Sequence, residues 1–150
     1  MNLQDRIYIL DGATGTALQQ FGLTEADFRG EEFAHHPIPL KGNNDVLNIT
    51  RPDVIRQVHQ NYIDAGADII ETNTFNANTI SQTEYGCVEW VSRLNLEGAR
   101  LAKETASACK ERKIYVAGSI GPTDKSLTLA PDPDQPTYRI VNFDTLANAY

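Results

Sequence analysis

The hydrophobic residues of this chain include three short runs, each followed by a glycine or a polar cluster. The first, Ile7–Leu10, shows no alternation of apolar and polar positions and stops at Asp11 and Gly12. An unbroken apolar run of this length is typical of a strand that is buried on both faces. Two further runs, Asp68–Thr72 and Ile114–Ala117, have the length and composition of strands. The pattern therefore predicts three short strands.

Two long stretches between these strands have the spacing of amphipathic helices. Their inward-facing positions are Val54, Ile55, Val58 and Tyr62 in the first stretch, and Leu94, Leu101, Thr105 and Cys109 in the second. Thr50, followed by Pro52 and Asp53, has the pattern of an N-cap for the first helix. Gly66 is placed to end that helix.

Shorter helices are predicted from the signals at their ends. They cover Thr16–Phe21, which Gly22 closes, a stretch from Thr79 capped by Asn78, and a stretch from Phe143 capped by Asn142. Residues 22–49 contain glycine, proline and polar clusters without periodicity, which predicts a long loop. Loops of this length are uncommon unless they have a function.

The alternation of strands and helices predicts parallel pairing with right-handed crossovers, and hence an α/β fold. Three strands are too few to close a barrel of eight. An isolated parallel sheet of this size would also leave apolar faces and edges exposed. The chain is therefore interpreted as a fragment, either of a barrel or of a doubly wound sheet.

Composition narrows the range of partners and compartments. Apolar residues make up 41% and charged residues 22%, as in an ordinary globular protein. A net charge of -7 disfavours nucleic acid and anionic membranes as partners. No membrane-spanning stretch or signal peptide is recognisable, and Cys87 and Cys109 are too isolated for a disulfide framework. We therefore expect a cytoplasmic protein in a reducing compartment.

Polar or glycine-rich segments follow all three predicted strands. They are Asp11–Thr16, Glu71–Asn76 and Gly118–Thr123. In barrels and in doubly wound sheets alike, ligands bind at the carboxyl ends of the strands. We therefore expect a binding site at this edge of the sheet.

The first of these segments suits either a ligand or a turn. Gly12 and Gly15 let the backbone approach a ligand and direct N–H groups towards a carboxylate or phosphate, while Asp11 could hold an ammonium group. The alternative is a strand-to-helix turn with Asp11 as its cap. No Gly-Lys-Ser/Thr follows and the Gly-x-Gly spacing is absent, which disfavours nucleotide binding.

Other polar segments leave the same alternatives open. Glu71 and Asn73 share a face of their strand and could line one pocket, unless the asparagines that follow only cap a helix. Gly118 and Gly121 would give a ligand room, or else form a simple turn. Gly42–Asp45 suits a structural loop closed by side-chain amides as well as it suits ligand contact.

Metal ligation finds little support in the residues themselves. The soft ligands are His35, His36, His59, Cys87 and Cys109. None of them has the spacing of a zinc site, and Cys109 fits the buried face of a helix. No Ser-His-Asp order is recognisable either. We therefore expect neither a metal ligand nor a catalytic residue within this chain.

Five segments carry a more specific signal. They are ILDGATGTALQ, DFRGEEF, LKGNNDVLNITRPDVI, YIDAGADIIETNTF and VAGSIGPTDKSLTLAPDPDQP. Together, from about Ile7 to Tyr150, they resemble the homocysteine-binding domain at the N-terminus of cobalamin-dependent methionine synthase, in the homocysteine S-methyltransferase family. The resemblance implies a (β/α)8 TIM-type barrel of which residues 1–150 hold about three strand-helix units. On this interpretation the barrel domain is incomplete and continues beyond Tyr150.

The resemblance implies a methyltransferase of methionine biosynthesis. In the family, zinc held by three cysteine thiolates binds the sulfur of homocysteine and keeps it as a thiolate that attacks a methyl group. The donor is methylcobalamin, recharged from 5-methyltetrahydrofolate through downstream folate-binding and cobalamin-binding domains. The zinc ligands are expected downstream of Tyr150, so the 150-residue chain alone is predicted to be inactive.

Residue roles carry over from the family by motif. The resemblance places Asp11, Gly12 and Ala13 in the loop that grips the amino-acid end of homocysteine. The same mouth would be lined by Glu71, Thr72, Asn73, Gly118 and Ser119. Thr14 departs from the family's DGAMG pattern, which has methionine there, so the packing around the substrate is expected to differ.

Two alternatives to methionine synthase stay open from the sequence. One is a cobalamin-independent homocysteine S-methyltransferase that uses betaine or S-methylmethionine. The other is a noncatalytic binding or assembly module, in which an open sheet edge pairs with a partner chain.

Overall fold

A small parallel sheet is the centre of this α/β structure, a computed structural model that describes residues 6–150. Its strands β1 (Ile69–Glu71) and β2 (Tyr115–Ala117) pair in parallel. Leu10 adds an isolated parallel bridge to Ile69 on the other side of β1. The three predicted strands therefore lie side by side in the same order as in the sequence, with β1 in the middle.

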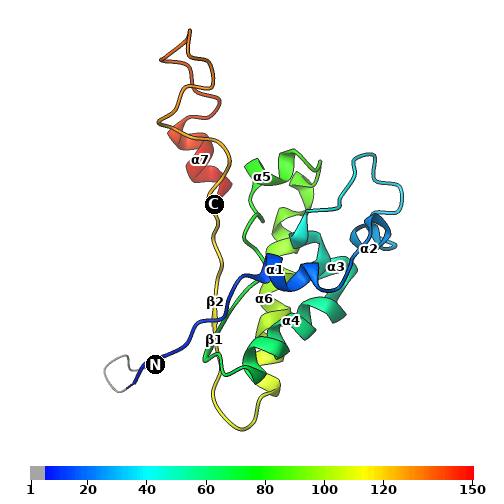
Figure 1. The fold of residues 1–150 in the computed structure, drawn as a ribbon. Coiled ribbons are helices and arrows are strands. Elements are labelled where there is room, and N and C mark those ends of the chain that lie inside the picture. Colours follow the sequence, from blue (N-terminus) through cyan, green and yellow to red (C-terminus); the bar gives the residue numbers. More distant parts are fainter. Residues whose placement is uncertain (1–5) are drawn as a thin grey trace.

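The first predicted strand is shorter and more exposed than expected. Of Ile7–Leu10 only Leu10 joins the ladder, and Ile7 and Ile9 are 88% and 56% exposed. The prediction of burial on both faces is therefore wrong for this segment. The reason is that the long helices lie on one side of the strands (Figure 1). Within the described range, Ile7 and Ile9 are left largely exposed.

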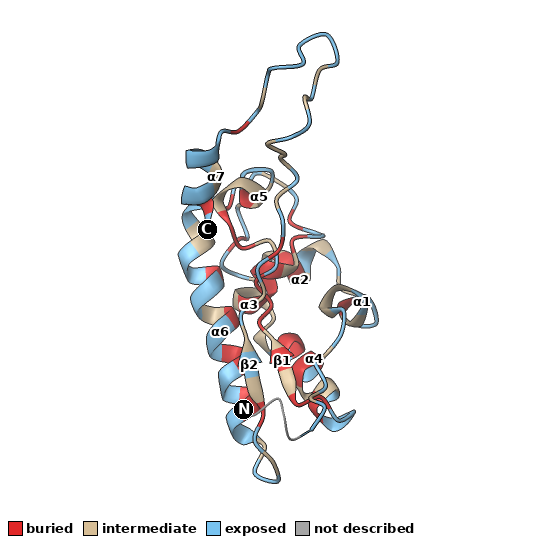
Figure 2. Ribbon diagram, turned by 90° about the vertical axis from the view of Figure 1, so that its left-hand side faces the viewer, coloured by how far each residue is buried: buried red, intermediate tan, exposed pale blue. Residues whose placement is uncertain are grey.

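Two long helices, α4 (Pro52–Asp64) and α6 (Val91–Ala108), pack against the sheet and against each other. Gly66, with a φ of 108°, follows the end of α4. Both helices match the predicted periodicity except at Cys109, which follows the end of α6 and is half-buried. Buried residues gather between α3, α4, α6 and β1 (Figure 2). The cluster that joins the sheet to the long helices consists of Ile63, Ala67, Ile70, Ala102, Ala106 and Ile114.

Thr50 does not cap α4, contrary to the prediction. The N-cap position belongs to Arg51, and the Thr50 hydroxyl instead donates to the Val46 carbonyl at 3.3 Å. The reason is an additional helical turn, α3 (Leu47–Thr50), which ends at Thr50 and which the sequence pattern did not predict.

Residues 22–49 are not the irregular loop that was predicted. They contain α2 (Glu25–Arg29) and a 3-10 turn, η1 (Asn44–Val46), which leads into α3. At the start of α2 the Asp27 carboxylate accepts hydrogen bonds from the backbone N–H and the hydroxyl of Thr24, at 2.8 and 2.7 Å. These elements have five residues or fewer, which is too short for a helical period to show in the sequence.

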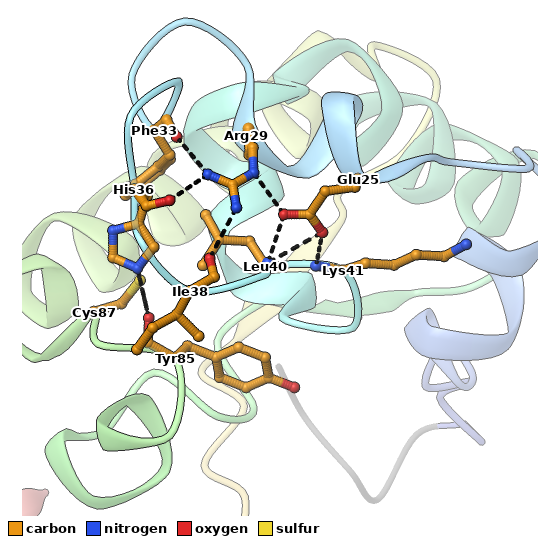
Figure 3. Close-up of polar contacts among 9 residues, drawn as sticks. All are labelled: Glu25, Arg29, Phe33, His36, Ile38, Leu40, Lys41, Tyr85 and Cys87. Atoms are coloured by element: carbon orange, nitrogen blue, oxygen red, sulfur yellow. Dashed lines mark hydrogen bonds and ion pairs between the residues drawn. The ribbon is translucent and has the colours of Figure 1, made fainter.

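An ion pair within α2 fastens the chain that follows it (Figure 3). Arg29 Nε lies 2.7 Å from the Glu25 carboxylate, and we call this pair the Glu25–Arg29 clamp. The Arg29 guanidinium donates to the backbone carbonyls of Phe33, His36 and Ile38. The Glu25 carboxylate accepts from the backbone N–H groups of Leu40 and Lys41. The clamp therefore fixes the segment that leads into η1.

The remaining elements are short: α1 (Thr14–Gln19), α5 (Thr79–Thr83), η2 (Val88–Trp90) and α7 (Phe143–Ala149). Asn78 and Asn142 cap α5 and α7 as predicted, accepting from backbone N–H groups at 2.9 and 2.8 Å. Helix α1 begins and ends two residues before the predicted Thr16–Phe21, with Gln20 as its C-cap, so Gly22, with a φ of 60°, lies in the turn that follows and does not cap the helix. Between β2 and α7 the chain extends away from the other helices (Figure 1). No helix within residues 6–150 is long and apolar enough to cross a membrane.

Candidate functional site

A cavity of about 330 Å³ lies at the carboxyl ends of the strands, where the sequence predicted a binding site. The loops after Leu10, β1 and β2 contribute to it, together with η1. Its lining consists of Gly12, Ala13, Thr14, Gly15, Asn44, Asp45, Glu71, Thr72, Asn73, Phe75, Asn76 and Ser119. The lining thus draws together segments that are far apart in the sequence.

Six of the eight residues predicted to bind substrate line this cavity. They are Gly12, Ala13, Glu71, Thr72, Asn73 and Ser119. Asp11 and Gly118, the other two, directly precede lining residues without belonging to the lining. Substrate binding by these residues stays a prediction, but the fold places them where they could act together.

Asp11 joins the first loop to β1. Its Oδ2 accepts a hydrogen bond from the Glu71 backbone N–H at 2.9 Å, whereas its Oδ1 is buried without a partner in the described part of the chain. Burial raises the pKa of the Asp11 carboxyl, and the Glu71 N–H partly offsets that effect. Because Ala13 takes the N-cap position of α1, the alternative in which Asp11 caps this helix is wrong.

The side chain of Asn73 is held in one orientation by two other asparagines. Its Nδ2 donates to the Asn44 carbonyl at 2.8 Å and to Asn48 Oδ1 at 3.0 Å. Asn48 Nδ2 in turn donates to the carbonyls of Asn73 and Leu94, at 2.7 and 3.1 Å. Both amide hydrogens of Asn73 are therefore used, which leaves its Oδ1 as an acceptor for a ligand.

A chain of hydrogen bonds joins the loops after β1 and β2. The Ser119 N–H donates to the Thr72 hydroxyl at 3.0 Å, and the Thr74 hydroxyl donates to the Ser119 carbonyl at 2.9 Å. The two threonine hydroxyls lie 2.7 Å apart, so Thr72 is the donor between them. These contacts fix the separation of the two loops at the cavity.

Gly121 is explained by packing rather than by room for a ligand. A Cβ at this position would lie 2.3 Å from the Phe75 carbonyl oxygen, and the Gly121 N–H donates to the same oxygen at 3.0 Å. Gly118 differs, because no atom lies within 4 Å of the position that its Cβ would take. Of the two glycines, only Gly118 leaves open space.

The segment Gly42–Asp45 has a structural residue and two residues that line the cavity, whereas ligand contact by this segment stays a prediction. Asn43 is buried and exchanges two amide hydrogen bonds with Gln82, at 2.7 and 3.0 Å. Asn44 and Asp45, by contrast, line the cavity. This segment is therefore structural at one residue and part of the site at the next two.

Asp45 lines the cavity although it was not among the residues predicted to bind substrate. It is 1% exposed, its Oδ1 accepts from the Asn76 backbone N–H at 3.1 Å, and burial raises its pKa to about 7. The only signal in the sequence was the polar run from Gly42 to Asp45, which is equally typical of a turn.

The residues present do not fit a zinc ion. Within residues 6–150 no group of three or more His, Cys, Asp or Glu side chains could hold a metal. Cys87 is buried, and burial raises the pKa of its thiol to about 11, which disfavours the thiolate that a metal requires. The nearby His36 Nε2 lies 2.7 Å from the Tyr85 carbonyl, its hydrogen-bond partner.

Comparisons with known proteins give one consistent answer. A sequence model described as homocysteine S-methyltransferase matches residues 8–150. The homocysteine methyltransferase MmuM from Escherichia coli is similar in its metallated form, with a TM-score of 0.59 and 26% identity over 80% of this chain and 40% of that one. Its oxidized form is similar with a TM-score of 0.61 and 28% identity over 80% and 39%. This chain thus spans about 40% of the length of these structures. It belongs to the homocysteine S-methyltransferase family.

Proposed function

We propose that the protein containing this chain transfers a methyl group to the sulfur of homocysteine, and that residues 1–150 provide part of its substrate pocket. The observation that carries the proposal is the cavity itself, which six residues of the family's substrate motifs line together. Its volume of about 330 Å³ suits a small amino acid. Membership of the family supports homocysteine as the methyl acceptor.

The charges of the lining favour the amino-acid end of the substrate over its sulfur. Asp45 and Glu71 are acidic, and the lining contains no lysine, arginine or histidine. An ammonium group is stabilised in such surroundings, whereas a thiolate is destabilised. We therefore place the ammonium group near the two carboxylates of the lining. The sulfur would then point out of the cavity, away from the lining residues.

The chemical step requires a deprotonated sulfur. The sulfur–methyl bond forms as the bond from the donor to the methyl group breaks, and the thiol must first lose its proton. No described residue is placed to stabilise the thiolate. We propose that zinc stabilises the thiolate. Its ligands would lie beyond Tyr150, in a complete (β/α)8 barrel.

The methyl donor divides the proposal into two candidates. The sequence motifs support methylcobalamin, recharged from 5-methyltetrahydrofolate, as in methionine synthase. The similarity to a homocysteine methyltransferase that is 26–28% identical supports the acceptor and leaves the donor open. The second candidate is therefore an enzyme that takes its methyl group from betaine or S-methylmethionine.

A donor comparison tests both candidates. The intact protein is incubated with zinc, homocysteine and one donor at a time, and methionine is measured by mass spectrometry. Turnover with methylcobalamin alone supports methionine synthase, and turnover with betaine or S-methylmethionine alone supports the second candidate. No methionine from any donor, together with no binding of homocysteine, would refute the methyltransferase and favour a noncatalytic module.

A further inference from the structure

Asp45 is the most deeply buried carboxylate in the wall of the cavity. It is 1% exposed and belongs to η1, where it is preceded by Asn43, whose side chain is anchored on Gln82, and by Asn44. The Glu25–Arg29 clamp fixes the chain just before it, through Leu40 and Lys41. Contacts on the N-terminal side of Asp45 therefore hold its backbone, and the Asn76 backbone N–H holds one of its carboxylate oxygens.

The hydrogen bonds of Asp45 do not balance its charge. Its Oδ1 accepts from the Asn76 backbone N–H at 3.1 Å. Among residues 6–150, no side chain donates to either oxygen and no lysine, arginine or histidine forms an ion pair with it. A buried carboxylate without a cation is unfavourable, and a neutral asparagine would accept the same N–H bond. A purely structural role therefore does not explain the charge at this position.

The surroundings of Asp45 define the ligand that would balance it. Glu71 lines the same cavity, and the Asp11 carboxylate lies against the Glu71 backbone N–H. Three carboxylates from three separate segments thus lie at or beside a cavity whose lining has no basic residue. Such a site attracts a small cation that can donate several hydrogen bonds, and a primary ammonium group has three donors.

We infer that Asp45 is a substrate-binding residue whose second carboxylate oxygen accepts a hydrogen bond from the ammonium group of the amino-acid substrate. The inference rests on the proposed function, and it adds a residue from η1 to the loops that the family motifs assign. The bound ammonium group lowers the pKa of Asp45 and keeps its carboxylate ionised. The charge that is unfavourable in the free protein is thereby balanced in the complex.

The test compares two ligands that differ only in the ammonium group. Binding of L-homocysteine and of 4-mercaptobutyrate, which lacks the ammonium group, is measured by calorimetry on the intact protein. Asp45→Asn keeps the acceptor for the Asn76 N–H and removes the charge. Asp64→Asn, on α4 and paired with Gln60, is the matched control.

We expect Asp45→Asn to weaken homocysteine binding by about tenfold to 100-fold, the range for a hydrogen bond between charged groups. Its affinity for 4-mercaptobutyrate should stay unchanged, and Asp64→Asn should match the wild type with both ligands. The Tm of Asp45→Asn should equal or exceed that of the wild type, because a neutral amide is less costly to bury than a carboxylate. If Asp45→Asn does not fold, Asp45→Ser repeats the comparison with a smaller acceptor.

Three results would overturn the inference. Equal homocysteine affinity in Asp45→Asn and wild type would remove Asp45 from the site while leaving the proposed function intact. An equal loss for both ligands would show that Asp45 supports the fold of the cavity and does not contact the ammonium group. Failure of the wild-type protein to bind homocysteine at all would overturn the proposed function and this inference together.

Discussion

Gly98 lies where α6 crosses the chain beneath the cavity, and replacing it with alanine tests the packing of the site. A Cβ at Gly98 would lie 2.6 Å from Thr74 Cγ2, 2.8 Å from Asn48 Nδ2 and 3.4 Å from the Asn73 carbonyl oxygen. The first two distances are shorter than a contact between these atoms allows. The substitution therefore moves Asn48 and Thr74 or pushes the helix away.

Two opposing effects decide the result of Gly98→Ala. Alanine is favoured over glycine in a helix by about 1 kcal/mol. Overpacking costs about 1–3 kcal/mol, and displacing the Asn48 amide leaves the buried Asn73 and Leu94 carbonyls short of a donor, at about 1–3 kcal/mol. We expect a net loss of about 1–5 kcal/mol in the free energy of unfolding, which lowers the Tm by roughly 2–20 °C.

Urea unfolding followed by circular dichroism measures this loss. Ser107→Ala, at an exposed position of the same helix, is the control that reports helix propensity without the steric overlap. Because Asn73 lines the cavity, homocysteine binding should weaken in Gly98→Ala as well. A Gly98→Ala protein as stable as the Ser107→Ala protein would refute the steric reasoning.

Three further substitutions test other features. Burial lowers the pKa of His59 to about 4, so between pH 6.5 and 4 only the unfolded chain takes up the proton, and the free energy of unfolding should fall by up to about 3 kcal/mol. His59→Leu should remove this loss in urea titrations at pH 7.5 and 4.5. A variant with the same pH dependence as the wild type would contradict the prediction. Arg29→Lys should lower the free energy of unfolding by about 1–3 kcal/mol, because one ammonium group cannot make all the hydrogen bonds of the guanidinium, which bonds to Glu25 and to three backbone carbonyls. A variant that unfolds at the same urea concentration as the wild type would show that the clamp does not stabilise the fold. Asn48→Asp keeps the oxygen that accepts from Asn73 but loses both hydrogen bonds that Asn48 donates. The KM for homocysteine should therefore rise with little change in kcat. A fall in kcat at an unchanged KM would argue against a role of Asn48 in positioning Asn73.

The parts of the fold that could be predicted are the long helices, in which apolar residues recur at helical spacing over several turns. Helices α4 and α6 have 13 and 18 residues, enough for apolar positions to mark a buried face. Helices α2 and α3 have five and four residues, and contacts such as the Glu25–Arg29 clamp hold them in place. The spacing of Thr24 and Asp27 was a usable signal for α2, since it marks a helix start without requiring a period.

The candidate site was predictable only where it follows a strand. Glu71, Thr72 and Asn73 come directly at the end of β1, and the rule that ligands bind at the carboxyl ends of parallel strands applies to them. Asp45 follows no strand. Its place in the cavity depends on the contact with Asn76, 31 residues later, and such distant pairings leave no periodic trace in one sequence.

The contacts described above differ greatly in how much chain they enclose, which has a consequence for the order of folding. The contacts of the clamp span four positions between Glu25 and Arg29 and at most 16 positions between Glu25 and Lys41. The contacts that shape the cavity span 25 residues between Asn48 and Asn73, and 45 between Thr74 and Ser119. Closing a longer loop has a higher entropic cost and is slower. We therefore expect the segment around the clamp to gain structure early and the cavity late, so that hydrogen exchange finds the cavity loops opening more readily than the clamp.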